Sequence, residues 1–179
     1  FNLDNIDYDF RILNKKKNLK NKIIELNQKN HARILAGYCW EWPKEGKNDP
    51  NYKDIEIDDF KMSWNLNNTD TYAIDEGSVH QVGCIHTAQG LEFDYVGVII
   101  GEDMRFKDGQ IITDYNERYT YDSSIRGIKK MAKSDPEKAN KLADKIVKNT
   151  YRTLMTRGMK GCYIYCVDEG LGDYFKRMM

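Results

Sequence analysis

The stretch Ile85-His86-Thr87-Ala88-Gln89-Gly90-Leu91-Glu92-Phe93-Asp94 decides the predicted fold of this chain. A strand-like run, 79–85, leads into it, and an almost purely apolar run, 95–100, leaves it. This order predicts a buried strand, a turn at the edge of a sheet and a second buried strand. Ligands of open α/β sheets bind outside the carboxyl ends of the strands. The polar residues of the stretch are therefore candidate ligand contacts at that edge.

Four residues of this stretch offer distinct chemistry to a ligand. Gly90 permits a positive φ angle or a close approach of the backbone to a phosphate. Thr87, Gln89 and Glu92 offer a hydroxyl, an amide and a carboxylate to such a ligand. The stretch is thus a candidate binding site for a ligand that carries phosphate.

Strand and helix signals alternate along the chain, which predicts a three-layer α/β fold with a mostly parallel sheet. Further strands are expected at 8–13, 33–38, 55–65 and 162–167. Helices are expected at 14–30, 171–179 and, as the longest, from 136 to about 157. Asp135 can cap this longest helix, and Pro136 suits its first turn. Arg152 and Arg157 therefore lie near its end.

The region 104–133 is predicted to be a hairpin followed by an insertion. Runs 104–107 and 110–113 flank Asp108-Gly109, a strong signal for a hairpin with a type I′ turn. Residues 115–132 are polar, rich in tyrosine and poorly periodic, so we expect them to be only partly ordered.

Two signatures of nucleotide binding are not met. No Gly-x-x-x-x-Gly-Lys pattern occurs, and Gly46-Lys47 lacks both the earlier glycine and the following Ser or Thr. Glu102 and Asp103 follow an apolar strand, as the acid of a magnesium-binding Walker B element does, but the missing phosphate loop disfavours that interpretation. The fold is therefore expected to lack its own Walker A motif.

The charge of the chain is balanced, with 28 basic and 28 acidic residues. It lacks the basic footprint of a stand-alone nucleic-acid binder, although balance is an average that permits a local basic face. Lys15-Lys16-Lys17 is interpreted as a solvated face, with phosphate contact as the alternative. Trp40 and Trp42 are interpreted as a cap on the core, with base stacking as the alternative.

Four cysteines without a Cys-x-x-Cys pair, and only three histidines, argue against structural zinc, and no metal site is predicted. Buried, reduced thiols are expected instead. No signal peptide or long apolar span occurs, so we expect a cytoplasmic protein without a membrane partner. The chain begins at Phe1, without an initiator Met, and we expect a domain excised from a longer protein.

Two segments resemble helicase motifs. His-Thr-Ala-Gln-Gly-Leu-Glu-Phe-Asp at 86–94 resembles motif V of superfamily 1 helicases. Asn-Thr-Tyr-Arg-Thr-Leu-Met-Thr-Arg-Gly at 149–158 resembles motif VI, with its core Thr-Arg pair. The likeness is closest to the Schlafen group 3-like DNA/RNA helicase domain, a bacterial family of unknown function. It extends from about Ala32 to the C-terminus, with both motifs in the family order.

The resemblance implies that residues 1–179 form one RecA-like domain of the P-loop NTPase type, with a lead-in strand and helix in 1–31. In similar proteins two RecA-like domains clamp ATP and Mg²⁺ between them, and the first carries the phosphate loop. This chain would be the second motor domain of a DNA or RNA helicase or translocase. Its partners would be an N-terminal RecA-like domain of the same chain and DNA or RNA. The isolated domain is expected to be inactive.

The resemblance also implies roles in nucleotide binding and catalysis. Arg157 would be the catalytic arginine finger, whose planar guanidinium suits the charge on a transferred phosphoryl group. Glu92 would contact the ribose, with Gly90, Gln89 and Arg152 as further nucleotide contacts. Many relatives carry Lys in place of Gln89, and Arg152 has no counterpart in the commonest motif VI. An alternative for Arg157 is a surface ion pair at a helix end.

The resemblance places His86 and Thr87 beside the nucleic-acid backbone. A purely structural role at a strand end is the alternative for His86. Two rival functions are also considered. One is a nucleotide-dependent switch, or a nucleic-acid- or protein-binding module, without unwinding activity. The other is a self-contained enzyme that uses Cys84 and His86, for which no orienting acid is evident.

Overall fold

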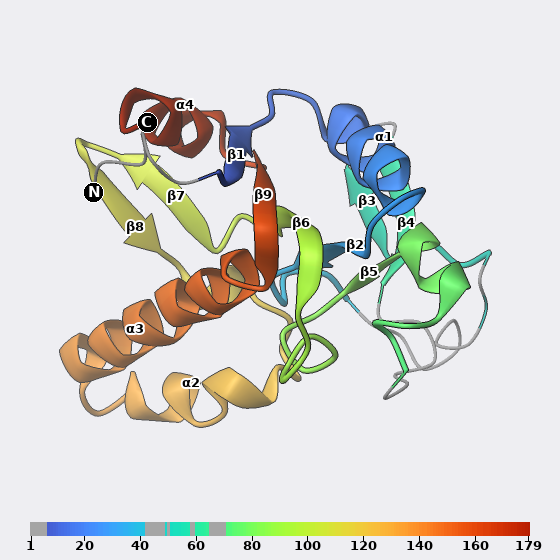
Figure 1. Cartoon of the computed structure of the whole chain (residues 1–179). Coiled ribbons are helices and arrows are strands. Elements are labelled where there is room, and N and C mark those ends of the chain that lie inside the picture. The colour runs from blue at the N-terminus through green and yellow to red at the C-terminus, as the bar shows by residue number, and fades with distance from the viewer. Residues whose placement is uncertain (1–6, 42–48, 50, 58–59, 65–70) are drawn as a thin grey trace.

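The computed structural model describes residues 7–41, 49, 51–57, 60–64 and 71–179. At their centre lies a seven-stranded sheet with the strand order β1-β9-β6-β2-β5-β4-β3 (Figure 1). Six of these strands run parallel, and β3 pairs antiparallel with β4. The strands are β1 (Asp9–Ile12), β2 (Ala32–Ala36), β3 (Ile55–Ile57), β4 (Phe60–Trp64), β5 (Gln81–Gly83), β6 (Phe93–Ile100) and β9 (Gly158–Cys166).

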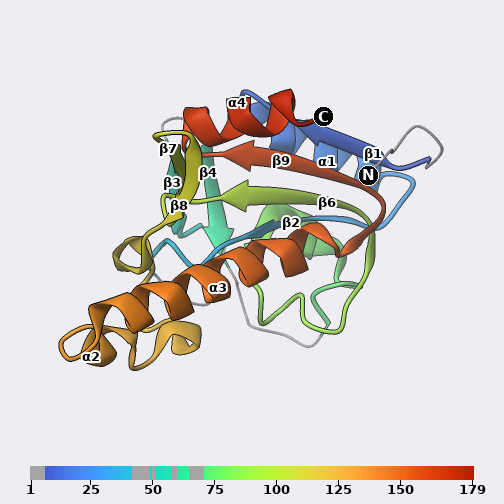
Figure 2. The ribbon, with the colours of Figure 1, turned by 90° about the vertical axis from the view of Figure 1, so that its left-hand side faces the viewer.

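Helices cover both faces of the sheet, which confirms the predicted three-layer α/β fold. In Figure 2, α3 lies in front of the sheet and α1 lies behind it. The α-helices are α1 (Lys16–Asn27), α2 (Ile128–Met131), α3 (Pro136–Met155) and α4 (Glu169–Arg177). Short 3-10 helices span Glu76–His80, Tyr115–Glu117 and Ser123–Ile125.

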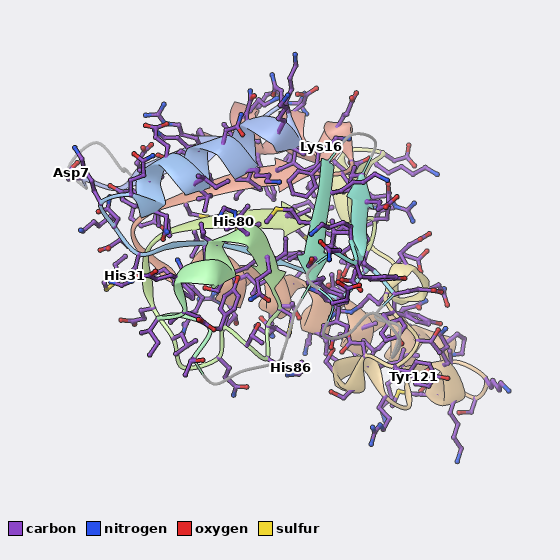
Figure 3. All side chains as sticks on the ribbon, turned by 90° about the vertical axis from the view of Figure 1, so that its right-hand side faces the viewer. Asp7, Lys16, His31, His80, His86 and Tyr121 are labelled. Atoms are coloured by element: carbon purple, nitrogen blue, oxygen red, sulfur yellow. The ribbon has the colours of Figure 1, made fainter. Side chains whose placement is uncertain are left out.

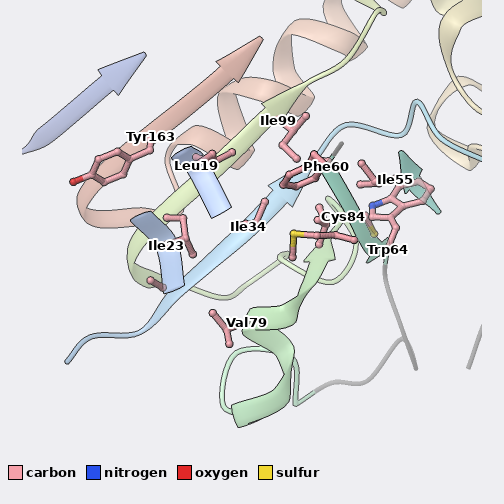
Figure 4. Close-up of a cluster of buried hydrophobic side chains, with 14 of the residues drawn as sticks. Leu19, Ile23, Ile34, Ile55, Phe60, Trp64, Val79, Cys84, Ile99 and Tyr163 are labelled. Carbon is pink, nitrogen blue, oxygen red and sulfur yellow. The ribbon is translucent and has the colours of Figure 1, made fainter. Parts of the chain in front are cut away.

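The sheet separates two apolar cores, because successive residues of a strand point to opposite faces. The core on the α1 side, drawn in Figure 4, includes Leu19, Ile23, Ile34, Ile99 and Tyr163. The core on the α3 side includes Leu35, Val98, Val147, Tyr151 and Leu154. The central strands are thus buried on both faces, as their continuous apolar runs predict.

Gly97, in the middle of β6, allows α1 to pack closely against the sheet. A Cβ atom at this position would lie 2.9 Å from side-chain atoms of both Leu19 and Ile23. The two helix side chains fill the space that a larger residue would need. The glycine therefore fixes how closely α1 approaches β6.

The first and last strands of the sheet are neighbours. β1 pairs parallel with β9, with Asp9 opposite Gly161 and Ile12 opposite Ile164. The Tyr163 hydroxyl also donates a hydrogen bond to the Asp9 carboxylate. The N-terminal segment is therefore part of the same sheet as the C-terminal one.

Two local predictions are confirmed in detail. The hairpin of β7 (Met104–Lys107) and β8 (Gln110–Thr113) turns at Asp108 and Gly109, whose φ angles are 52° and 81°. Positive φ at both central residues is what a type I′ turn requires. At the start of α3, the Asp135 carboxylate accepts a hydrogen bond from the Lys138 backbone amide at 3.0 Å, and Pro136 lies in the first turn.

The expectation of a partly ordered insertion at 115–132 is wrong. Arg118 in this region is fully buried and lies between two fully buried carboxylates, at 3.1 Å from Asp103 and 2.6 Å from Asp122. The Tyr151 hydroxyl of α3 also donates to Asp103. This network, here called the Arg118 cluster, ties the insertion to the end of β6 and to α3. Both carboxylate oxygens of Asp103 are engaged in this network, which disfavours the Walker B interpretation.

The strand expected at 79–85 is shorter than predicted: residues 81–83 form β5, whereas 79–80 end the 3-10 helix Glu76–His80. The cause is Arg33, which is only 2% exposed. Its guanidinium donates to backbone carbonyls of Ala73 and Asp75, each at 3.0 Å, and to the Ser78 hydroxyl at 2.5 Å. These bonds require the preceding segment to coil around the arginine.

The four cysteines are free, as predicted. Cys84, Cys162 and Cys166 are buried, and burial raises the pKa of Cys162 and of Cys166 to about 12. These thiols therefore stay protonated at neutral pH. Among the described helices, none combines the length and apolar character that crossing a membrane would need.

Candidate functional site

The loop of residues 84–92, here called the motif V loop because it holds most of the stretch that resembles motif V, joins β5 to β6 (Figure 1). β5 ends at Gly83, and β6 begins at Phe93, which is level with Gly158 of β9. Because β5 and β6 run in the same direction within the sheet, the loop must return from the carboxyl end of one to the amino end of the other. The expected position at the carboxyl edge is therefore wrong for Glu92, which lies at the amino edge.

The first half of the motif V loop is held by its own hydrogen bonds. The Thr87 hydroxyl accepts from the Cys84 backbone amide at 2.8 Å and donates to the Cys84 carbonyl at 3.1 Å. The Ala88 amide donates to the same carbonyl at 3.0 Å. Gly90 has a φ of 77°, so the expected positive φ is confirmed. The Thr87 hydroxyl is thus engaged inside the loop.

The outward side of the motif V loop carries the polar groups that remain available. His86, Gln89 and Glu92 are exposed. Within the described residues, the side chains of Gln89 and Glu92 form no hydrogen bond or ion pair. The His86 ring contacts Tyr38 edge-on, with ring centroids 5.7 Å apart. Two of the three groups are therefore free to meet a ligand.

Arg157 follows the C-terminus of α3 and contacts the motif V loop directly. Its Nη1 donates to the Leu91 carbonyl at 3.4 Å, and its Nε donates to the Thr153 carbonyl at 3.3 Å. In return, the Phe93 amide donates to the Arg157 carbonyl at 2.9 Å. The structure therefore brings the motif V and motif VI segments together at the amino edge.

The Arg157 guanidinium is half-buried and contacts only neutral acceptors. Within the described residues no carboxylate forms an ion pair with it, so the alternative of a surface ion pair is not supported. Its two hydrogen bonds are long, and a guanidinium has five donors. The partial negative charge at the end of α3 favours a cation there. The side chain retains donors and a full charge for an incoming anion.

Asp94 links the starts of three strands beside this site. Its carboxylate accepts from the His31 backbone amide at 2.9 Å and pairs with Lys160 at 2.9 Å. Hydrogen bonds from His31 and Lys160 lower the pKa of Asp94. The last residue of the stretch is therefore structural, and it joins β6 to the starts of β2 and β9.

A groove of about 460 Å³ opens beside the start of β2. Its walls include His31, Ile74, Glu76 and His80. The two histidines are labelled in Figure 3. This groove was not predicted from the sequence. Its signal was Arg33, a charged residue inside an apolar strand, which organises the 71–80 wall of the groove.

Arg152 is placed differently from Arg157. It is exposed in the last turn of α3 and, within the described residues, its side chain has no ion-pair or hydrogen-bond partner. Within the described residues, its side chain forms no hydrogen bond or ion pair with the motif V loop. Arg157 and the motif V loop therefore form the candidate site, and Arg152 lies outside their contacts.

The rival enzyme based on Cys84 and His86 is not supported. Cys84 is 0% exposed, and burial raises the pKa of its thiol. Its sulfur lies 3.7 Å from the Thr87 hydroxyl, whereas the His86 ring packs against Tyr38. A buried, protonated thiol without a base is not a nucleophile.

The expected core cap is confirmed for one of the two tryptophans. Trp40 packs against the buried Trp64, with ring centroids 6.4 Å apart. Trp42 and the Gly46-Lys47 pair lie outside the described residues. Base stacking by Trp40 would require it to leave this contact.

Comparison with known proteins gives two matches. The family model described as Schlafen group 3, DNA/RNA helicase domain matches residues 1–168. Uncharacterized protein YPL245W of Saccharomyces cerevisiae is 27% identical over 158 residues, which are 84% of this chain and 32% of the yeast protein. The chain thus spans about a third of the length of this relative. No solved structure matches the chain.

Proposed function

Because this chain belongs to the Schlafen group 3 DNA/RNA helicase domain family, we propose that it is the second motor domain of an ATP-dependent DNA or RNA helicase or translocase. ATP is bound mainly by an N-terminal RecA-like domain of the same chain, which carries the phosphate loop. The present domain supplies the motif V loop and Arg157 from the other side of the nucleotide. The amino edge of its sheet faces the cleft between the two domains.

The observation that carries the proposal is the environment of Arg157. A half-buried guanidinium with two long bonds to carbonyls, and no carboxylate partner among the described residues, is ready for an anion that comes from outside the domain. The γ-phosphate of ATP on a facing domain is such an anion. The planar fork can bind two phosphoryl oxygens at once.

The contact with Leu91 couples the phosphate to the rest of the site. When Arg157 turns toward a phosphate, its bond to the Leu91 carbonyl changes, and Glu92 follows Leu91 in the chain. In the proposal Glu92 contacts the ribose, and Gly90 and Gln89 lie beside the nucleotide. His86 and Thr87 lie toward the nucleic acid, at the other end of the same loop.

This arrangement supports a two-state motor. Arg157 has an anionic partner only while ATP closes the cleft, so ATP favours the closed state and hydrolysis favours the open one. The Arg157 side chain is bonded to Leu91 in the motif V loop, and the Arg157 backbone is bonded to Phe93 directly after it, so the loop moves with the change. Each cycle then shifts the loop relative to the nucleic acid.

Magnesium is assigned to the N-terminal domain in this proposal. Mg²⁺ is usually bound by one or two carboxylates plus substrate phosphates. The described residues contain no group of three His, Cys, Asp or Glu side chains that could hold a metal ion. When bound with ATP, Mg²⁺ would neutralise charge on the phosphates, and Arg157 would add to that effect from the opposite side.

The first prediction compares the full-length protein with this domain alone. We expect the full-length protein to hydrolyse ATP and to do so faster with DNA or RNA. The isolated domain should bind ATP weakly and not hydrolyse it, because it lacks the phosphate loop. Phosphate release and calorimetry measure both properties. Steady turnover by the purified domain would overturn the two-domain proposal, and ATPase without strand separation or translocation would favour a nucleotide-dependent switch.

The second prediction concerns Glu92, which is exposed next to the start of β6. In the full-length protein, Glu92→Ala should raise KM for ATP several-fold and change kcat little. A ribose contact is made equally in the ground and transition states, so its loss affects binding alone. Glu102→Ala is the matched control, because Glu102 is an exposed acid beyond the opposite end of β6. An unchanged KM with a collapsed kcat would contradict the ribose role.

A further inference from the structure

The basic residues of this chain are not evenly distributed. The whole chain is neutral, yet residues 126–157 contain ten Lys and Arg residues against three Asp and Glu residues. This segment includes α2 and α3. A neutral protein therefore carries a local excess of positive charge on one face of its sheet.

Five of these residues form a single row along α3, here called the basic row. They recur every three or four positions, and all five are exposed: Lys138, Lys141, Lys145, Lys148 and Arg152. This spacing places them on one side of the helix, with neighbours about 5–6 Å apart. The opposite side of α3, with Val147 and Tyr151, packs against the sheet. The row extends over about 21 Å at the rise of an α-helix.

The charges of the basic row are largely uncompensated. Lys148 pairs with Asp144 at 2.8 Å. Across the part of the chain that the structure describes, the other four members have no carboxylate within ion-pair distance. In Figure 2, no segment of the described chain lies in front of α3. The row therefore faces solvent as an open line of positive charge.

We propose that the basic row binds the phosphate backbone of a nucleic-acid duplex. Lysines are compact charges on flexible stems, and a regular series of them suits repeated phosphates without regard to sequence. α3 exposes no aromatic ring on which unpaired bases could stack, because its one aromatic residue, Tyr151, is fully buried. That composition favours a duplex over a single strand.

The inference rests on the proposed motor function and adds a second contact to it. The motif V loop would hold the track along which the motor moves, and the basic row would hold the duplex beside it. It also gives Arg152 a role: this residue ends the row, instead of contacting the nucleotide. The row then leads from the outer end of α3 toward the motif VI segment.

The test uses full-length protein in which Lys141→Gln and Lys145→Gln are combined. Lys15→Gln with Lys17→Gln is the matched control, because it removes the same charge from exposed residues at the start of α1, on the other face of the sheet. Fluorescence anisotropy measures binding of a labelled 20-base-pair duplex and of a single strand as a function of salt. A melting curve shows that each variant is folded.

The row variant should bind the duplex about tenfold more weakly at ~0.1 M salt, and the slope of log K against log salt should shrink by about two. The control should match the wild type, and single-strand binding should fall less. An unchanged slope in the row variant, while the wild type shows nucleic-acid-stimulated ATPase, would overturn this inference alone. A wild type that binds no nucleic acid but binds polyglutamate through the row would overturn it in favour of an acidic protein partner. Absence of any stimulated ATPase would instead contradict the motor function on which it rests.

Discussion

Arg157→Ala in the full-length protein is expected to lower kcat for ATP hydrolysis by about three orders of magnitude, the lower end of what arginine fingers supply. Substrate binding should change far less, because the contact strengthens as charge develops on the phosphoryl oxygens. Arg157→Lys should restore little activity, because a point charge on a flexible stem does not replace the planar fork. Steady-state kinetics on the purified variants measure all three expectations.

The fold should survive the loss of Arg157. Its side chain makes two long hydrogen bonds to carbonyls and belongs to neither apolar core. Arg126→Ala, which removes an exposed arginine beyond the Arg118 cluster, is the control for loss of charge alone. Normal turnover in Arg157→Ala would show that this residue is not a finger. A fall of turnover together with the melting temperature would show a structural role.

Arg118→Met is expected to destabilise this chain by about 3–5 kcal/mol, the usual effect of removing one partner from a buried ion pair. Asp103 and Asp122 would remain in an environment where their side chains are fully buried. Tyr151 can donate to Asp103, but it brings no charge. Urea unfolding of the purified domain measures the loss, and limited proteolysis should cut the variant first within 115–132.

Arg105→Met provides the contrast. Arg105 also lies near several acids, at 3.5 Å from Asp114 and 3.8 Å from Glu117, but its side chain is one-third exposed. Exposed pairs contribute about 0–1 kcal/mol, so this variant should stay close to wild type. Converting Asp103 and Asp122 to Asn alongside Arg118→Met should recover part of the stability. Equal effects of Arg118→Met and Arg105→Met would contradict the role assigned to the Arg118 cluster.

Much of the fold was predictable because its signals are local. The apolar run of β6 identified a strand buried on both faces, and Asp108-Gly109 identified the turn of the hairpin. Asp135 and Pro136 located the start of α3 to the residue. In each case the deciding interaction joins residues only a few positions apart, so the sequence contains it directly.

The predictions that were wrong concern segments whose structure depends on residues far apart in the sequence. Arg118 reaches Asp103, 15 positions away, and Arg33 reaches Asp75, 42 positions away. No local pattern in 115–132 or 71–80 reveals these partners. The polar residues that fold around Arg118 were therefore interpreted as a loosely ordered insertion, and residues 79–80, at the end of the 3-10 helix beside Arg33, as part of a strand. A buried cation is a tertiary feature, and its effect on the backbone appears only in three dimensions.

The sequence predicted which residues belong to the candidate site better than it predicted where in the fold they lie. The motif V loop and Arg157 were identified from their residues, and their roles stay predictions. Their meeting at the amino edge was not expected, because β5 is only three residues long and the chain returns at once, without a crossover helix. The contact between the Phe93 amide and the Arg157 carbonyl follows from strand pairing of β6 with β9, which no motif encodes.

The pairing of β1 with β9 limits how much of the domain can fold during translation. Asp9 and Tyr163, which are hydrogen-bonded, are 154 positions apart in the chain. Translation delivers the N-terminal end first, so β1 must wait for almost the whole domain to emerge before its partner exists. Until then one edge of β6 and the apolar side of α1 are incompletely covered, and such surfaces are what chaperones bind. The sheet is therefore completed only as synthesis of the domain ends.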